Sequence, residues 1–83
     1  MRYEKVYVDV TVRFLKEGGM RPLDMIWIDG KRYFIDKVKF IERLPSKAGG
    51  TLPVRYTVLI CGLERYLYFE SHTERWFVEK KLV

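Results

Sequence analysis

Side chains that commonly bind metals or act as nucleophiles are scarce in this sequence. It contains one histidine, His72, and one cysteine, Cys61, which lie eleven positions apart. A structural zinc site needs four ligands gathered at short spacings from histidine, cysteine and carboxylates. The sequence therefore predicts no metal site and no bound cofactor. Cys61 follows an apolar run and is expected to be a small buried side chain.

Catalytic motifs are missing as well. No serine or cysteine lies beside a candidate base in a nucleophile motif, and the glycine pairs at 18–19 and 49–50 lack the Lys and Ser/Thr of a phosphate loop. Asp29 suits a turn, while Asp24 and Asp36 occur where strands need polar residues. No catalytic residue is assigned, and a non-enzymatic role is expected.

Positive charge is concentrated in the middle third of the chain. The net charge is +5, and residues 1–30 and 59–83 are each neutral. Residues 31–58 hold seven basic side chains against Asp36 and Glu42. Such an excess favours an anionic partner, with nucleic acid as the leading class.

Alternating apolar residues predict β-strands along most of the chain. From Val6 to Phe14 an apolar side chain occurs at every second position, which predicts a long strand between Tyr3 and Phe14. Asp29-Gly30 is typical of a two-residue hairpin turn within residues 23–44. Along the second strand of that hairpin, the apolar side chains change from one face to the other, which indicates a β-bulge or bend near Asp36-Lys37.

The second half of the chain predicts three more strands. Residues 45–53 have the composition of a flexible loop, two strands follow it, and residues 75–81 are best interpreted as a last strand. A short helix capped by Ser71, with Glu74 completing a capping box, is the alternative for that last segment.

These elements predict one all-β domain over residues 1–83, a small six-stranded SH3-like or open β-barrel. The single cysteine requires no oxidising compartment, and neither a signal-peptide core nor a run of roughly 18 apolar residues is present. A cytoplasmic protein without membrane contact is expected.

Arginine precedes an aromatic ring three times, at Arg55-Tyr56, Arg65-Tyr66 and Arg75-Trp76. Neighbours on a strand point to opposite faces, so both members of a pair cannot share one surface. The pattern therefore favours rings directed inward and arginines directed outward. For Arg65-Tyr66 the sequence does not decide which side chain points inward, because residues 67–69 place apolar side chains on both faces.

A row of cations is the stronger candidate for binding phosphates. Lys37, Lys39 and Arg43 share one parity, and Lys47 lies in the predicted loop. Together with Arg55 they form the predicted phosphate-contacting set, and Trp27 or Tyr68 is the expected stacking residue if it is exposed. Lysines on an edge strand also deter unwanted strand pairing, which is a structural alternative for the row.

The chain resembles a group of small bacterial β domains of unknown function, some of them encoded beside or fused to translesion DNA polymerases. The similarity spans most of residues 21–78 and rests on Arg21-Pro22, Trp27, Gly30, Tyr33, Ile35, Val38, Arg55-Tyr56, Val58, Leu67-Tyr68, Trp76 and Val78. The resemblance implies a role in nucleic-acid metabolism and supplies no catalytic residues.

The sequence thus predicts a non-enzymatic module that binds nucleic acid through residues 31–58. The alternative is a protein-interaction or self-associating domain that uses a sheet edge or an exposed aromatic patch.

Overall fold

The computed structural model describes residues 2–44 and 52–82. Within these residues the chain forms seven strands: β1 (Arg2–Phe14), β2 (Met20–Ile26), β3 (Arg32–Phe34), β4 (Lys37–Arg43), β5 (Val54–Ile60), β6 (Leu63–Glu70) and β7 (Arg75–Leu82). The all-β prediction is confirmed, whereas the predicted number of six strands is wrong. No described residue belongs to a helix long and apolar enough to cross a membrane.

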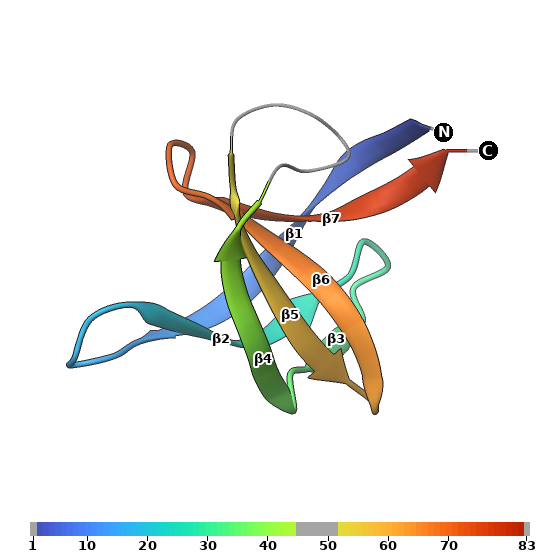
Figure 1. The fold of residues 1–83 in the computed structure, drawn as a ribbon. Helices are drawn as coiled ribbons and strands as arrows, with labels where there is room; N and C mark the ends of the chain where they lie inside the picture. The colour runs from blue at the N-terminus through green and yellow to red at the C-terminus, as the bar shows by residue number, and fades with distance from the viewer. Residues whose placement is uncertain (1, 45–51, 83) are drawn as a thin grey trace.

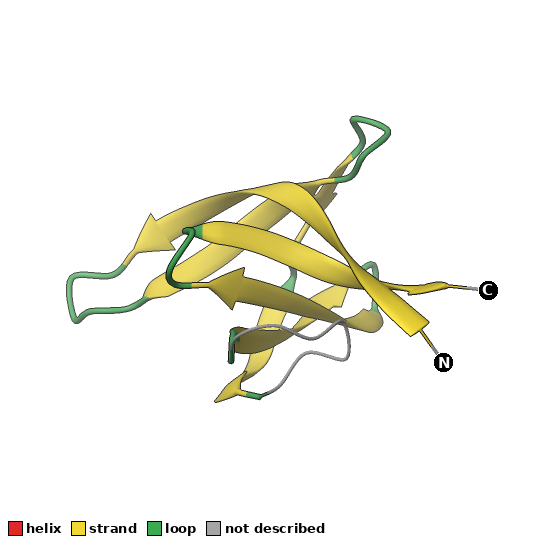
Figure 2. Ribbon diagram, turned by 90° about the horizontal axis from the view of Figure 1, so that it is seen from above, coloured by secondary structure: helices red, strands yellow, loops and turns green. Residues whose placement is uncertain are grey.

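One antiparallel sheet with the strand order β3-β2-β1-β7-β6-β5-β4 contains all seven strands (Figure 1). The long strand β1 pairs with β7 through Arg2–Val8 and with β2 through Asp9–Phe14. The two edge strands, β3 and β4, are consecutive in the chain, so the sheet must curl to bring its ends together. Seen from above, the sheet curls into a half-barrel (Figure 2).

The short link between β3 and β4 explains the extra strand. The Ile35 N–H donates to the Leu23 carbonyl, and the Asp36 N–H donates to the Leu59 carbonyl. Two successive residues therefore bond to strands near opposite ends of the sheet, Ile35 to β2 and Asp36 to β5. The expected single strand over this region is wrong because its halves pair with different neighbours. The crossing lies where a bulge or bend was predicted, near Asp36-Lys37, and an additional bulge lies between Val38 and Phe40.

The inner face of the curled sheet holds the main core. Its buried members come from β2, β5, β6 and β7 and are Met25, Tyr56, Val58, Ile60, Leu67 and Trp76. The rings of Tyr56 and Trp76 pack at 5.0 Å between centroids. Both aromatic residues were predicted to point inward, and the structure confirms this.

The outer face carries a second packed cluster, which alternation by itself did not predict. Phe77 is fully buried there, stacked on Tyr68 with centroids 4.9 Å apart, and Tyr7 meets its ring edge-on at 5.9 Å. The Lys5 ammonium lies 4.9 Å from the Phe77 centroid. Strands β1, β6 and β7 are therefore packed on both faces.

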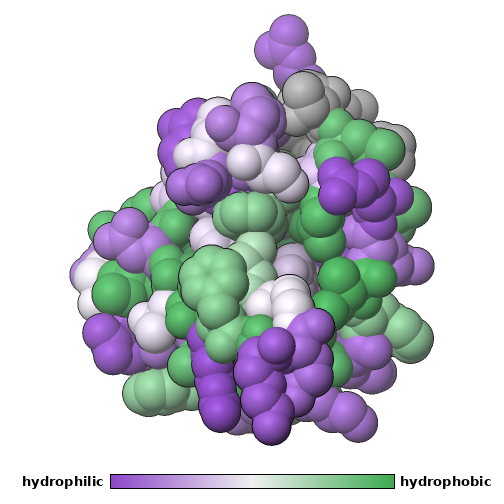
Figure 3. Space-filling view, turned by 90° about the vertical axis from the view of Figure 1, so that its left-hand side faces the viewer, coloured by the Kyte–Doolittle hydropathy of each residue, from purple (hydrophilic) through white to green (hydrophobic). Residues whose placement is uncertain are grey.

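The last segment is the strand β7, as predicted, and the capped helix is not formed. Residues 71–74 make a turn whose Glu74 N–H donates to the Glu70 carbonyl. Within the described residues, apolar side chains also reach the surface, among them Phe14, Phe34 and Phe40. On the side of the molecule in Figure 3, hydrophobic side chains extend across the middle of the face, and hydrophilic ones are grouped mainly above and below them.

Cys61 is exposed in the turn between β5 and β6, contrary to the expectation of burial. Its φ of 52° and the φ of 75° at Gly62 are both positive, as in a type I′ turn. Cysteine tolerates this conformation less well than asparagine. Replacing Cys61 by asparagine is therefore expected to raise the free energy of unfolding by about 0.5–1 kcal/mol in urea titration.

The matched control is Cys61→Val, since a β-branched side chain at positive φ is strained. That variant is expected to be less stable than the parent protein. An Asn variant that is less stable than the parent would contradict the assigned turn.

Candidate nucleic-acid interface

Two exposed aromatic rings lie on the outer face of β4, β5 and β6. Phe40 pairs directly with Thr57, and Thr57 pairs with Tyr66. Directly opposed residues of antiparallel strands share a face. Phe40 is 58% exposed and Tyr66 is 44% exposed, while Thr57 between them is buried. Two strand spacings separate the ring-bearing strands, a distance of about 10 Å.

Arg55 lies in the neighbouring cross-strand row, between Glu42 and Tyr68. Its guanidinium carbon is 4.1 Å from the centroid of the Tyr66 ring, and its Nη2 is 3.0 Å from Glu42 Oε2. Burial alone would lower the pKa of Arg55, but the contacts with Glu42 and Tyr68 outweigh it and raise the pKa. A fixed positive charge thus covers part of one exposed ring.

Two lysines border this pair of rings on β4. Lys37 pairs with Leu59 and therefore lies on the outer face, and it is exposed. Lys39 occupies the bulge, with its Nζ 3.0 Å from Glu64 Oε2. Exposed ion pairs of this kind contribute only about 0–1 kcal/mol. An incoming phosphate can therefore compete with Glu64 for Lys39.

The predicted row of Lys37, Lys39 and Arg43 is not formed. The bulge between Val38 and Phe40 changes the parity of β4. Arg43 consequently pairs with Val54 on the inner face, and its Nη1 donates to the Leu52 carbonyl at 3.1 Å. Lys47 lies outside the described residues. Of the predicted cations, the structure brings together Lys37, Lys39 and Arg55.

Neither predicted stacking residue belongs to this surface. Trp27 is half-buried and packs against the inner core. Tyr68 is only 1% exposed, and its hydroxyl donates to Glu79 Oε1 at 2.9 Å. Burial, followed by this hydrogen bond, raises the pKa of Tyr68 to about 12. Because Tyr68 is almost fully buried, neither face of its ring is open to a base, and Tyr68 is excluded as a stacking platform.

Sequence reasoning missed Phe40 and Tyr66 for identifiable reasons. Phe40 shares the parity of Val38 in the sequence, and only the bulge turns it to the outer face. Tyr66 lies in the one Arg-aromatic pair that alternation left open. Its partner Arg65 pairs with Val58 and so points to the inner face. The ring, rather than the arginine, is outward in this pair.

Potential metal ligands are dispersed in the part of the chain that the structure describes. No group of three or more His, Cys, Asp or Glu side chains there is arranged to hold a metal ion. Comparisons with family models, curated proteins and solved structures find no match for this chain.

Proposed function

We propose that this protein is a non-enzymatic, cytoplasmic module that binds single-stranded nucleic acid on the outer face of β4, β5 and β6. The observation that carries the proposal is the pair of exposed rings, Phe40 and Tyr66, bordered by Lys37, Lys39 and Arg55. Aromatic faces stack bases, and cations beside them neutralise the phosphates. The resemblance to domains found beside translesion polymerases supports the same class of partner.

The fold is suited to this task. An antiparallel sheet holds the two rings at a defined spacing, and stacking on such a surface tolerates any base sequence. We also propose that the curled sheet is an open, SH3-like barrel. Its ends meet at the link between β3 and β4, while β6 pairs with β7 only through Tyr68–Glu70.

Binding of labelled single-stranded DNA, single-stranded RNA and duplex DNA across a salt series tests the proposal. With three phosphate contacts, the logarithm of the affinity for single strands should fall with the logarithm of salt concentration at a slope of about −2. Tyr66→Ala and Phe40→Ala are each expected to weaken single-strand binding by about tenfold, because a stacked base contributes about 1–3 kcal/mol.

Phe34→Ala is the matched control, since this exposed ring lies on β3, at the other end of the strand order. It is expected to leave affinity within about twofold of the parent, a change of less than about 0.5 kcal/mol. Absence of binding to every probe at about 50 mM salt would refute the proposal.

A further inference from the structure

Among the described residues, no strand pairs with the first half of β6 on the side away from β5. Strand β5 pairs with β6 along Leu63–Phe69, but β7 pairs with it only at Tyr68–Glu70. Ile60 and Leu63 flank a two-residue turn and so form a hydrogen-bonded pair. Alternation along the ladder then directs the N–H and C=O groups of Glu64 and Tyr66 away from β5. Both residues thus present strand-pairing groups at this edge.

A cavity of about 480 Å³ adjoins the same edge. Its walls are mainly apolar and come from β2, β3, β5, β6 and β7 and from Trp27 after β2; among them are Met25, Tyr33, Ile60, Leu67 and Val78. The side chains that β6 directs toward it are those of Leu63, Arg65 and Leu67, because their partners on β5 belong to the inner face. A strand added beside β6 would place every second side chain over this cavity.

The charge at the cavity selects the kind of strand that fits. Arg65 is exposed there and forms no ion pair with any described residue. Lys31 lies over the Tyr33 ring at 5.3 Å, which adds a second cation beside the cavity lining. Glu79 also borders the cavity, but it accepts the hydroxyl hydrogen bond of Tyr68. An inward-pointing arginine discourages indiscriminate strand pairing and admits a segment that supplies a carboxylate.

We propose that this edge and cavity bind an extended acidic and apolar segment of a partner protein. The segment pairs with the Glu64 and Tyr66 backbone groups, places apolar side chains in the cavity and sets an Asp or Glu against Arg65. This site adjoins the nucleic-acid surface and shares Tyr66 with it, since Tyr66 also borders the cavity. The two sites use opposite faces of β6, because the Glu64 and Tyr66 side chains point to the outer face while Arg65 and Leu67 point inward.

Selection of a random peptide library displayed on phage, with the intact protein as bait, tests this directly. Enriched sequences are expected to carry a carboxylate with apolar residues two positions away on either side. A synthetic peptide of the enriched sequence should shift the NMR amide signals of Glu64 and Tyr66 and the indole signal of Trp27. Arg65→Glu is expected to weaken binding of this peptide by roughly 10- to 100-fold, because the substitution removes one charge-assisted hydrogen bond.

Lys16→Glu is the control with the same change of charge, at an exposed site in the turn between β1 and β2. It should alter peptide affinity by no more than about twofold. The proposal fails if no peptide is enriched or if enriched peptides are basic. It also fails if shifts are confined to Phe40 and Thr57, where nucleic acid is proposed to bind. Sedimentation that shows a dimer, with the Glu64 signal shifting on dilution, would assign the edge to a second copy instead.

Discussion

Replacing Phe77 by alanine is expected to lower the free energy of unfolding by about 4 kcal/mol. The side chain is fully buried on the outer face, where it meets Tyr68, Tyr7 and Lys5. Truncation removes the transfer free energy of the ring and leaves a cavity that stiff strands cannot collapse around. Urea-induced unfolding followed by tryptophan fluorescence measures the loss.

Phe14→Ala provides the control, because Phe14 is 77% exposed near the end of β1. It is expected to change stability by less than about 0.5 kcal/mol. Equal stability of the two alanine variants would contradict the packing of Phe77 in a second cluster on the outer face.

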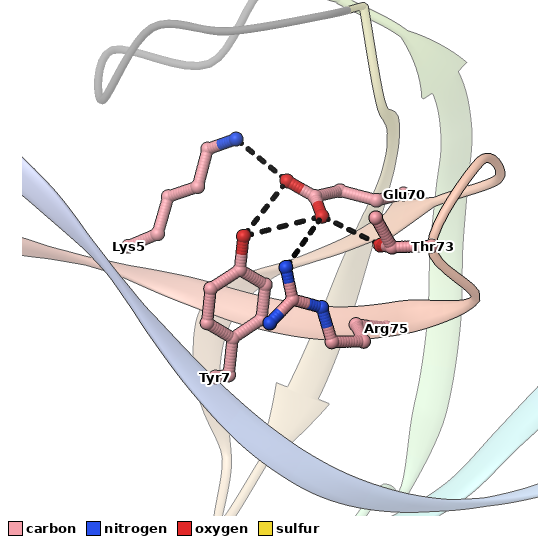
Figure 4. A network of polar contacts seen from close by, with 5 residues as sticks. All are labelled: Lys5, Tyr7, Glu70, Thr73 and Arg75. Atoms are coloured by element: carbon pink, nitrogen blue, oxygen red, sulfur yellow. Dashed lines mark hydrogen bonds and ion pairs between the residues drawn. The ribbon is translucent and has the colours of Figure 1, made fainter.

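Replacing Glu70 by glutamine is expected to cost about 2 kcal/mol, the next largest effect. Glu70 is buried at the end of β6 and gathers donors from two other parts of the chain (Figure 4). Lys5 Nζ lies 2.6 Å from Oε2, Thr73 Oγ1 donates to Oε1 at 2.7 Å, and the Tyr7 hydroxyl reaches both oxygens at 3.1–3.2 Å. Hydrogen bonds to a charged group are worth about 1.5–3 kcal/mol, and glutamine cannot replace the charge beside Lys5.

The same network makes stability depend on pH. Burial alone would raise the pKa of Glu70, but the hydrogen bonds from Lys5, Thr73 and Tyr7 outweigh it and lower the pKa from 4.5 to about 2. A lowered folded-state pKa means that the stabilisation is complete above pH 4.5 and is lost as the pH falls toward 2. The stability difference between the parent protein and Glu70→Gln should therefore shrink across this range in urea titrations.

Glu64→Gln is the matched control, because its ion pair with Lys39 is exposed. It should cost about 0–1 kcal/mol. A difference between the parent and Glu70→Gln that stayed constant from pH 5 to pH 2 would show that the carboxylate is not held by these donors.

The alternation of apolar and polar residues was sufficient to predict where several strands lie and which of their side chains point inward. It placed a strand at β1, directed Tyr56 and Trp76 inward and favoured a strand over a helix at β7, and the structure confirms these predictions. The alternation works because successive side chains of a strand point to opposite faces wherever the strand is regular. It fails at Lys39, where one extra residue in β4 separates Lys37 from Arg43 and turns Phe40 outward.

By itself, the sequence determined an all-β chain, its main inward-facing residues and the concentration of cations between residues 31 and 58. The tertiary structure decided which strands are neighbours, and therefore that Phe40, Tyr66 and Arg55 share one surface while Tyr68 is buried against Phe77. It also decided that, within residues 2–44 and 52–82, part of β6 has no strand paired to one of its edges. The physical reason is that local alternation assigns a face to each side chain, whereas pairing and curvature depend on contacts between residues distant in the chain.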